Sequence, residues 1–471
     1  MSCPIPAGFH ALPLPIVQLS LAAVLKCGQS FRWSIFPLSS GPVPPSHPTH
    51  EYRLCLRDRV VCLRQSPDTL YYSTVLPTRD QHASSTIFEE EKVRKETLDW
   101  IRDYFQLDVD LLHLYNDWSQ RDPVFKSFRD RFEGIRMLRQ DPWENLISFI
   151  CSSNNNISRI TKMVTSLCEH FSPPLLSLPP PELYSDSSAS SLLSPPATPL
   201  SERPLSQSQQ QEDMSTERSL RTYHPFPSPA ALASSSVASI LRSLGFGYRA
   251  EYVQKTAQML SEAHPPKSED DDSAERYLRT LRDMSTGEAR EALLGFMGVG
   301  RKVADCVLLM SLDKKEVVPV DTHVHQIAMR YYGVSSGSKA RSNGKIPMTP
   351  KIYDQVNAKL AEVWGDYAGW AHSVLFTADL KSFSTYGLDI PTPVPASSVS
   401  DLFTGLPTPP ITPSPSPTKS RGKRRKAAVL VPETSISAKE ESTDEIIQDD
   451  SSLSLAERVK KRRRVTILAK R

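Results

Sequence analysis

Apolar residues recur at two different spacings along this chain. Between about residues 9 and 75, short apolar alternations such as Tyr52–Leu56 and Val60–Leu63 are separated by turns of proline, serine and glycine. This alternation is typical of antiparallel strands. Further along, apolar residues return every three or four positions, as in Lys95–Phe105 and Val124–Phe132, which is typical of amphipathic helices. The pattern therefore predicts a sheet followed by a mainly helical part, an α+β fold.

The helical part is punctuated by residues that start or end helices. Asp141–Glu144 combines a capping aspartate, a proline at the first helical position and an acidic residue near the positive end of the dipole, so a helix should begin there. Asn154–Asn156 should end it, because asparagine competes for backbone hydrogen bonds, and should present amides at a surface. The polar stretch Ser335–Lys345 is predicted to be a loop. Further helices are predicted at Ala230–Leu244, Tyr248–Glu262, Glu275–Leu281, Pro350–Trp364 and Ala368–Lys381.

A glycine-rich stretch lies between two of the helical patterns. Helices at Glu288–Leu294 and Lys302–Leu312 should be joined by a tight turn at Met297–Gly300, a helix-hairpin-helix. Glycine allows positive φ and close approach of a ligand, and the second helix starts with free N–H groups, which suits a phosphate of a DNA backbone. A bare pair of glycines more often marks an ordinary helical turn, so the neighbouring residues decide the interpretation.

Two polar residues near this hairpin are candidates for catalysis. Lys302 lies at the start of the second helix, where its charge opposes the helix dipole, so stability alone does not account for it. Its amine is a candidate nucleophile of the Schiff-base type. Asp321 follows the apolar run Val317–Val320 and opens another amphipathic helix. It can act as a helix cap or as a carboxylate that stabilises developing positive charge.

The amino-acid composition of two segments predicts that they do not pack into the folded core. The chain has 471 residues and 40 prolines, many of them in the Pro/Ser/Gln-rich segment 173–221 and in the tail 386–471. We expect both to be disordered, the first as an insertion within the helical domain. The tail carries basic clusters at Arg421–Lys426 and Lys460–Arg464, which we interpret as nuclear localisation signals. Non-specific nucleic-acid arms and solvated charge runs are the alternatives.

Net charge, cysteine spacing and the lack of long apolar runs give no indication of a metal site, a membrane anchor or a matrix-targeting presequence. The net charge of +3 is too close to zero to imply DNA binding by itself. The seven cysteines have no metal-ligand spacing, so we expect reduced thiols in an intracellular protein and no bound metal. No apolar run approaches the length of a membrane span, and the first basic residue is Lys26, so neither a membrane anchor nor a matrix-targeting presequence is expected.

Several longer sequence motifs indicate one family. They are GQSFRW (Gly28–Trp33), ISFICSSNNNI (Ile147–Ile157), LGFGYRAEYV (Leu244–Val253), GVGRKVADC (Gly298–Cys306), PVDTH (Pro319–His323) and WGDYAGWAHSVLF (Trp364–Phe376). Because these motifs occur in the same order as in that family, the chain resembles the eukaryotic, fungal-like 8-oxoguanine DNA glycosylases/AP lyases of the helix-hairpin-helix superfamily. The resemblance implies a TATA-binding-protein-like antiparallel sheet domain with following helices at 1–120 and a helix-hairpin-helix glycosylase domain at 121–385.

The resemblance also implies roles for individual residues. Lys302 and Asp321 would be catalytic. The pocket for the damaged base would be formed by Gly28, Cys306, Met310, His372 and Phe376. DNA would be bound by Asn154, Arg159, Tyr248, Arg249, Gly298, Gly300 and His323, with Tyr248 as the wedge and Asn154, Arg159 and Arg249 around the orphaned base. His372 departs from the family, which usually has glutamine there.

The implied reaction is excision of 8-oxoguanine and related oxidised purines opposite cytosine, followed by β-elimination, in base-excision repair. It needs no cofactor. We expect a monomer in the nucleus that acts on double-stranded DNA, has no membrane partner and engages a nuclear import receptor through the basic tail. Two alternatives remain at this point. An alkylated-base glycosylase would not need Lys302, and a module that only docks DNA would need neither Lys302 nor Asp321.

Overall fold

The structure, a computed structural model, describes residues 5–39, 44, 46–77, 87–182, 220–265, 268, 271–334 and 348–388. All of these residues belong to one compact unit. The greater part of the predicted insertion, residues 183–219, and both basic clusters of the tail lie outside the described residues. The loop predicted at Ser335–Lys345 lies outside them as well.

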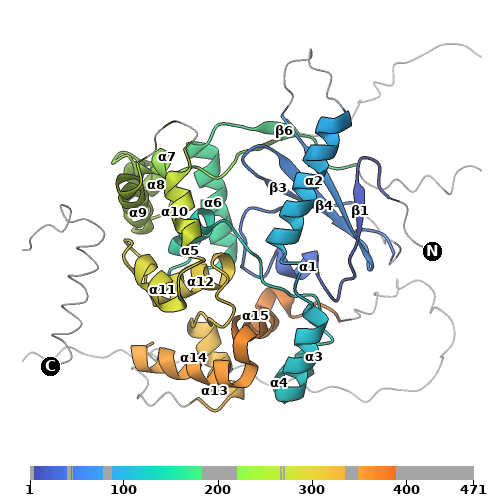
Figure 1. The fold of residues 1–471 in the computed structure, drawn as a ribbon, viewed down its shortest axis with the longest axis vertical. Coiled ribbons are helices and arrows are strands. Elements are labelled where there is room, and N and C mark those ends of the chain that lie inside the picture. Colours follow the sequence, from blue (N-terminus) through green and yellow to red (C-terminus); the bar gives the residue numbers. More distant parts are fainter. Residues whose placement is uncertain are drawn as a thin grey trace, which may run out of the picture. The chain divides into compact units, whose positions relative to one another are not determined.

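The N-terminal part forms a five-stranded antiparallel sheet in the order β1-β5-β4-β3-β2. Its strands are β1 (His10–Pro13), β2 (Ser34–Pro37), β3 (His50–Cys55), β4 (Val60–Gln65) and β5 (Thr69–Val75). In register, Tyr52 lies opposite Leu63 and Leu63 opposite Tyr72, so these side chains share one face. That face packs against α1 (Leu21–Val24) and α2 (Ile87–Tyr104), as Figure 1 shows for α2. The predicted sheet domain is confirmed.

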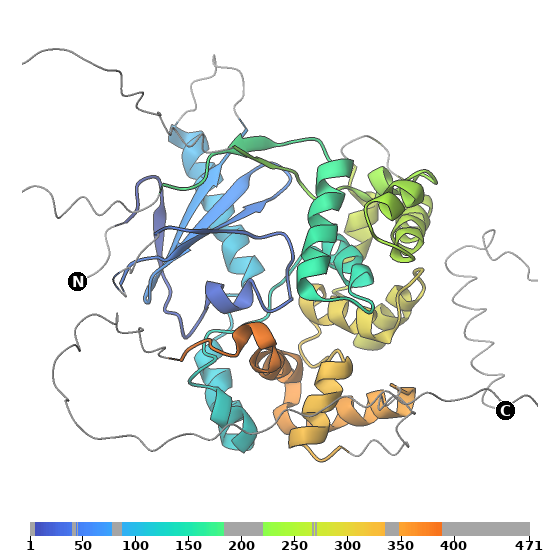
Figure 2. The same cartoon turned by 180° about the vertical axis from the view of Figure 1, so that it is seen from behind.

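The opposite face of the sheet is partly covered by the ends of the predicted insertion. Two short antiparallel strands, β6 (Leu176–Leu178) and β7 (Arg221–Tyr223), pair with each other. Their apolar residues pack with Cys55, Val60 and Cys62, and Figure 2 shows this pair from the side opposite to Figure 1. The prediction of disorder over 173–221 was wrong at both ends. The average composition of the segment concealed the few apolar residues that pack.

The helical part contains thirteen α-helices in the described ranges. They are α3 (Leu111–Arg121), α4 (Pro123–Phe128), α5 (Pro142–Cys151), α6 (Ile157–Phe171), α7 (Pro229–Ala233), α8 (Val237–Ser243), α9 (Arg249–Ala263), α10 (Ser273–Thr280), α11 (Thr286–Leu294), α12 (Arg301–Ser311), α13 (Thr322–Tyr331), α14 (Pro350–Trp364) and α15 (Ala368–Asp379), with 3-10 turns at Gly365–Tyr367 and Lys381–Phe383. The single helix predicted at Ala230–Leu244 is two, because the serines at 234–236 interrupt it.

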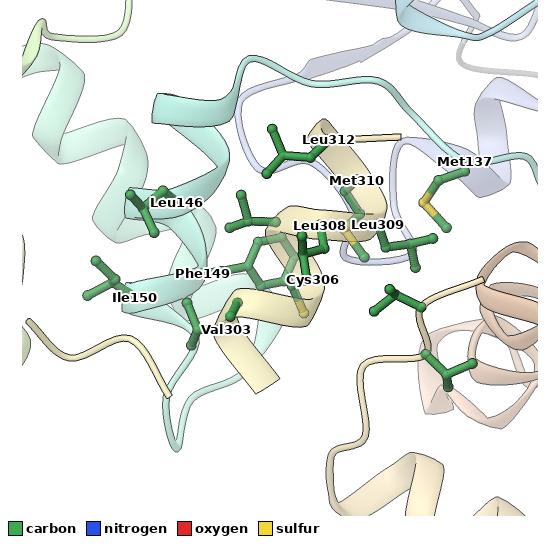
Figure 3. Close-up of a cluster of buried hydrophobic side chains, with 14 of the residues drawn as sticks. Met137, Leu146, Phe149, Ile150, Val303, Cys306, Leu308, Leu309, Met310 and Leu312 are labelled. Carbon is green, nitrogen blue, oxygen red and sulfur yellow. The ribbon is translucent and has the colours of Figure 1, made fainter. Parts of the chain in front are cut away.

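The core of the helical part is centred on α12. Every residue from Val303 to Ser311 is buried. Figure 3 shows Phe149 of α5 beside Cys306 and Val303 of α12. The start of α5 follows its sequence signal, since Asp141 accepts hydrogen bonds from the N–H groups of Trp143 and Glu144. Apolar contacts along α12 therefore hold the helix that carries Lys302 in place. Within the described ranges, no helix has the length and hydrophobicity to cross a membrane.

Candidate active site

The predicted helix-hairpin-helix is formed by α11, the turn at 295–300 and α12. Gly298 has φ +76°, and a Cβ there would stand 2.5 Å from the ring of Tyr252, so only glycine fits. The hydroxyl of Thr256 donates to the carbonyl of Met297 at 2.9 Å and anchors the turn on α9. Gly300 precedes α12 and supplies no side-chain cap, which leaves the first N–H groups of α12 available for an anion. α12 begins at Arg301, one residue before the predicted start.

The amine of Lys302 lies between α12 and α5. Its Nζ donates to Ser152 Oγ at 3.2 Å and lies 4.8 Å from the centroid of the Phe149 ring. Both neighbours come from the end of α5, so the packing of α5 on α12 fixes the direction of the lysine side chain. A hydroxyl and an aromatic face therefore hold the end of the Lys302 side chain in one position.

Asp321 caps α13. Its Oδ1 accepts from the N–H groups of His323 and Val324, each at 2.9 Å, so the capping interpretation is confirmed. Both of these bonds go to the same oxygen atom. Capping therefore does not exclude a second role for the carboxylate, which also lines two cavities together with Lys302.

The first of these cavities has a volume of about 920 Å³ and lies between the sheet domain and the helices. All five residues predicted for the base pocket line it: Gly28, Cys306, Met310, His372 and Phe376. The second has a volume of about 950 Å³ and lies over the hairpin. Five of the predicted DNA-binding residues line it: Asn154, Arg159, Gly298, Gly300 and His323. Lys302 and Asp321 line both cavities, so they stand where the two meet.

Gly28 lies on a loop that the neighbouring glutamine pins in place. The side chain of Gln29 is buried, donates to the carbonyl of Arg136 at 3.1 Å and accepts from the N–H of Leu138 at 3.0 Å. Gly28 itself has φ +91°, and a Cβ there would meet Ile157 at 2.9 Å. Its backbone is therefore held in a conformation that other residues rarely adopt, against the wall of the first cavity.

His372 is a buried polar side chain on the wall of this cavity. The residue is 6% exposed, and neither ring nitrogen makes a hydrogen bond of standard geometry among the described residues, although the backbone of Gly369 lies close enough to favour the protonated ring. Burial lowers the pKa of His372 to about 4, and the negative charge of Asp321 offsets this only in part. The ring is therefore neutral near pH 7, with one N–H donor and one acceptor nitrogen. Its centroid lies 5.9 Å from that of Phe376.

Cys306 and Met310 complete the apolar side of the cavity. Both lie on α12, one and two turns after Lys302, and both are buried. Burial raises the pKa of Cys306 to about 11, although the nearby charge of Lys302 acts in the opposite direction. The thiol is therefore protonated and behaves as a small apolar surface rather than as a nucleophile.

The residues predicted to hold the opposite strand are arranged around the turn at Ser153 and Asn154. Tyr248 is 49% exposed, and its hydroxyl donates to the carbonyl of Ser153 at 3.0 Å. Arg249 is 3% exposed, donates to the carbonyls of Ser153 and Asn154, and lies 4.5 Å from the Tyr248 ring centroid. Arg159, in contrast, is exposed and donates to the carbonyl of Gly245 at 3.2 Å. The structure thus gives the two predicted base-contacting arginines different surroundings.

His323, the predicted phosphate ligand, has an acidic neighbour. Its Nδ1 lies 3.4 Å from a carboxylate oxygen of Asp379 on α15. Asp379 also pairs with Arg330 at 3.0 Å, so its charge is shared between a cation and the imidazole. His323 lines both cavities, beside this shared carboxylate.

Comparison with known proteins identifies the family. Residues 11–146 match the 8-oxoguanine DNA glycosylase, N-terminal domain, and residues 206–346 match the HhH-GPD superfamily base excision DNA repair protein. The N-glycosylase/DNA lyase of Saccharomyces cerevisiae is 34% identical over 390 residues, covering 80% of this chain and 87% of the yeast protein. The chain belongs to the family of 8-oxoguanine DNA glycosylases/AP lyases.

A plant relative agrees with this assignment, and a bacterial structure shares the fold. The N-glycosylase/DNA lyase OGG1 of Arabidopsis thaliana is 31% identical over 380 residues, covering 79% of this chain and 81% of the plant protein. The 8-oxoguanine glycosylase/lyase of Clostridium acetobutylicum, solved with double-stranded DNA containing cytosine opposite 8-oxoguanine, shares the fold with a TM-score of 0.51 at 24% identity. That alignment covers 77% of this chain and 91% of the bacterial one. The chain is therefore a DNA N-glycosylase with lyase activity.

Three groups at the glycosylase site were not predicted from the sequence. Ser152 and Phe149 hold the amine of Lys302, although they lie on a different helix. Lys26 is a second amine on the wall of the first cavity, and desolvation there lowers its pKa. The spacing of Phe149 and Ser152 on α5 puts them on one helix face, but no local signal indicates that this face meets α12. Among the described residues, six cysteines are free thiols and no cluster of His, Cys, Asp and Glu is suited to a metal.

Proposed function

We propose that this DNA glycosylase/lyase excises 8-oxoguanine opposite cytosine through a Schiff base on Lys302. The observation that carries the proposal is the position of Lys302 and Asp321. Both residues line the first cavity, which would hold the base, and the second cavity, which lies over the hairpin. A nucleotide flipped from the duplex would pass between these cavities, with its sugar beside both groups. Flipping costs a few kcal/mol, which contacts in the two cavities offset.

The chemistry follows from the two groups. The Lys302 amine, after loss of a proton, attacks the anomeric carbon, and the bond to the base breaks as its electron pair leaves with the base. Positive charge develops on the sugar, and the carboxylate of Asp321 stabilises it. Opening of the sugar ring gives a Schiff base between Lys302 and the anomeric carbon. The Schiff base acidifies the neighbouring carbon, and loss of a proton there expels the 3′ phosphate by β-elimination.

Selection of the oxidised base is assigned to the wall of the first cavity. 8-Oxoguanine carries a hydrogen at N7, whereas guanine carries a lone pair, so the carbonyl of Gly28 is a discriminating acceptor. Guanine would leave two acceptors facing each other, at a cost of roughly 1–3 kcal/mol. Cys306 and Met310 would cover one side of the base and Phe376 the other. His372, neutral and buried on this wall, is suited to read the Watson–Crick edge with one donor and one acceptor.

Contacts to the duplex are assigned to the second cavity and its rim. Tyr248 is exposed at the start of α9 and is suited to fill the gap left by the flipped nucleotide. Asn154, Arg159 and Arg249 would surround the orphaned cytosine, whose N3 and O2 are adjacent acceptors for a guanidinium. Gly298, Gly300 and His323 would bind phosphates. The protein is expected to act as a monomer in the nucleus, imported through its basic tail clusters.

Borohydride trapping tests the proposal and separates it from its alternatives. Duplex DNA with 8-oxoguanine opposite cytosine should give a covalent adduct with the parent protein. Lys302→Gln should give neither adduct nor base release while still binding the damaged duplex. Asp321→Asn should act slowly and still be trapped to a small extent, because the amide preserves the cap but not the charge. Base release by Lys302→Gln without adduct or strand cleavage would favour the alkylated-base alternative, in which water is the nucleophile. Strand cleavage by this variant would contradict the Schiff base on Lys302.

A further inference from the structure

The segment that leads into Asp321 is held by side chains of α14. The carbonyl of Val318 accepts from the side-chain amide of Asn357 at 2.8 Å. The N–H of Val320 donates to the hydroxyl of Tyr353 at 3.1 Å. Val318 and Val320 are buried, so these backbone groups have no water to replace a lost partner. Asp321 is the next residue, and its position depends on both anchors.

The hydroxyl of Tyr353 also connects this segment to the helix of Lys302. It donates to Asp305 Oδ2 at 2.6 Å, while Arg290 Nε donates to Asp305 Oδ1 at 2.7 Å. Asp305 is fully buried on α12, three residues after Lys302. Burial and the charge of Asp305 raise the pKa of Tyr353, so its hydroxyl remains a donor. One phenol oxygen therefore bridges the helix of the nucleophile and the chain that carries Asp321.

The ring of Tyr353 is fixed by other contacts than its hydroxyl. The guanidinium of Arg301 lies 4.3 Å from the ring centroid, and Tyr353 as a whole is 4% exposed. Ring and hydroxyl thus have separable functions. Replacing tyrosine by phenylalanine preserves the packing and removes only the two hydrogen bonds.

We propose that Tyr353 is a positioning residue for catalysis, which sets the distance between Asp321 and Lys302 through its bonds to Val320 and Asp305. The inference rests on the proposed role of Asp321. A carboxylate displaced by a fraction of an ångström stabilises charge on the sugar less well, and a misplacement of 1 Å can cost about 100-fold in rate. Base excision depends on this charge. Attack on a preformed abasic site requires only the amine of Lys302.

The test compares base excision with cleavage of a preformed abasic site, both under single-turnover conditions with the full chain. For Tyr353→Phe we expect base excision to fall about 10-fold or more, whereas abasic-site cleavage falls less than about threefold. Tyr115→Phe is the matched control. Tyr115 is buried like Tyr353, donates to the carbonyl of Phe132 at 2.8 Å and accepts from the N–H of Ile135 at 3.2 Å, without lining either cavity. It should lose stability to a similar extent and keep both rates.

A double variant separates the positioning role of Tyr353 from the catalytic role of Asp321. In the Asp321→Asn background, Tyr353→Phe should change base excision less than about twofold, because the group it positions is already neutral. An equal loss with and without Asp321→Asn would show a general structural effect and overturn the inference. The inference would also be overturned if Tyr353→Phe excised the base at the parental rate while Asp321→Asn was slow. A parental rate in Asp321→Asn itself would instead overturn the catalytic role of the aspartate.

Asn357→Leu extends the test should Tyr353→Phe fail to fold. It removes the bond to Val318 at the other anchor of the same segment and leaves Asp305 satisfied. Base excision should fall relative to abasic-site cleavage, in the same direction as for Tyr353→Phe. An unchanged ratio of the two rates in this folded variant would overturn the inference.

Discussion

Gly369, at the start of α15, lies directly against the backbone of Val317. A Cβ at Gly369 would stand 2.3 Å from the carbonyl oxygen of Val317, and the N–H of Gly369 donates to the carbonyl of Lys315 at 2.9 Å. The segment that carries Asp321 is thus packed against α15 on a backbone surface where any side chain would intrude.

Gly369→Ala should therefore lower the free energy of unfolding by about 1–3 kcal/mol, the usual cost of overpacking. Gly287→Ala is the matched control, since Gly287 lies in α11 and a Cβ there meets nothing within 4 Å. It should leave stability unchanged or raise it slightly, because alanine favours the helix. Denaturant unfolding of both variants measures the difference, and equal stability of the two would contradict the packing described.

The two arginines near the Asn154 turn should differ when each is replaced by alanine. Arg159→Ala should relax the preference for cytosine over the other opposing bases by about 1–3 kcal/mol with little change in stability, because the side chain is exposed. Arg249→Ala should also lower stability, since its guanidinium holds the carbonyls of Ser153 and Asn154. Single-turnover rates with each opposing base, together with thermal unfolding, separate these effects. A uniform loss across all opposing bases would instead indicate phosphate contacts.

The predicted insertion should be removable only in part. Joining Glu182 to Leu220 through a short glycine–serine linker preserves β6 and β7, and should leave activity and Tm nearly unchanged. Deleting 174–221 removes β6 and uncovers Cys55, Val60 and Cys62, so Tm should fall by at least about 2–4 °C. Thermal unfolding of the two deletions tests this, and equal Tm values would show that the β6–β7 pair contributes no stability.

His372 should make stability depend on pH in a definite window. Its pKa is about 4 in the folded state, against about 6.5 in the unfolded chain, so below about pH 6.5 the unfolded chain binds a proton that the folded state does not. The free energy of unfolding therefore falls as pH drops, by about 2 kcal/mol at about pH 5 from this group. His372→Gln should remove that slope. Urea unfolding of both proteins at about pH 7 and about pH 5 measures it, and parallel losses would contradict the assigned burial effect.

The catalytic behaviour of His372 is a separate prediction. If the neutral imidazole reads the base, protonation removes its acceptor and slows base release, whereas His372→Gln keeps activity on 8-oxoguanine opposite cytosine without that pH dependence. Because burial lowers its pKa to about 4, the loss should set in well below neutral pH. Identical pH profiles of single-turnover base release in the two proteins would show that His372 does not read the base.

Local signals in the sequence predicted much of this fold. Pro350–Trp364 coincides with α14, and the cap at Asp141 starts α5 as expected. The hairpin and the two catalytic candidates were also predicted, because the glycines, Lys302 and Asp321 belong to short motifs. Contacts between distant segments were not predictable from such motifs. Ser152 lies 150 positions from Lys302, and its bond to the amine exists only because α5 packs on α12.

The same limit explains why Tyr353 was not recognised as part of the site. Its position on α14 satisfies ordinary helical periodicity, so the sequence gives it no role other than packing. The bonds from its hydroxyl to Asp305 and Val320 follow from the way α12 and α14 meet. In β6 and β7, by contrast, the apolar residues were present in the sequence but were outnumbered by their Pro, Ser and Gln neighbours.

Peptide mapping of the borohydride-trapped complex tests the central assignment most directly. Among the described residues, three lysines line the first cavity, Lys26, Lys302 and Lys381, and each carries an amine able to react with the sugar. After nuclease digestion, mass spectrometry of the tryptic peptides should place the reduced sugar remnant on Lys302 and show missed cleavage at that residue. A remnant on Lys26, on Lys381 or on the N-terminal amine would contradict the proposed mechanism.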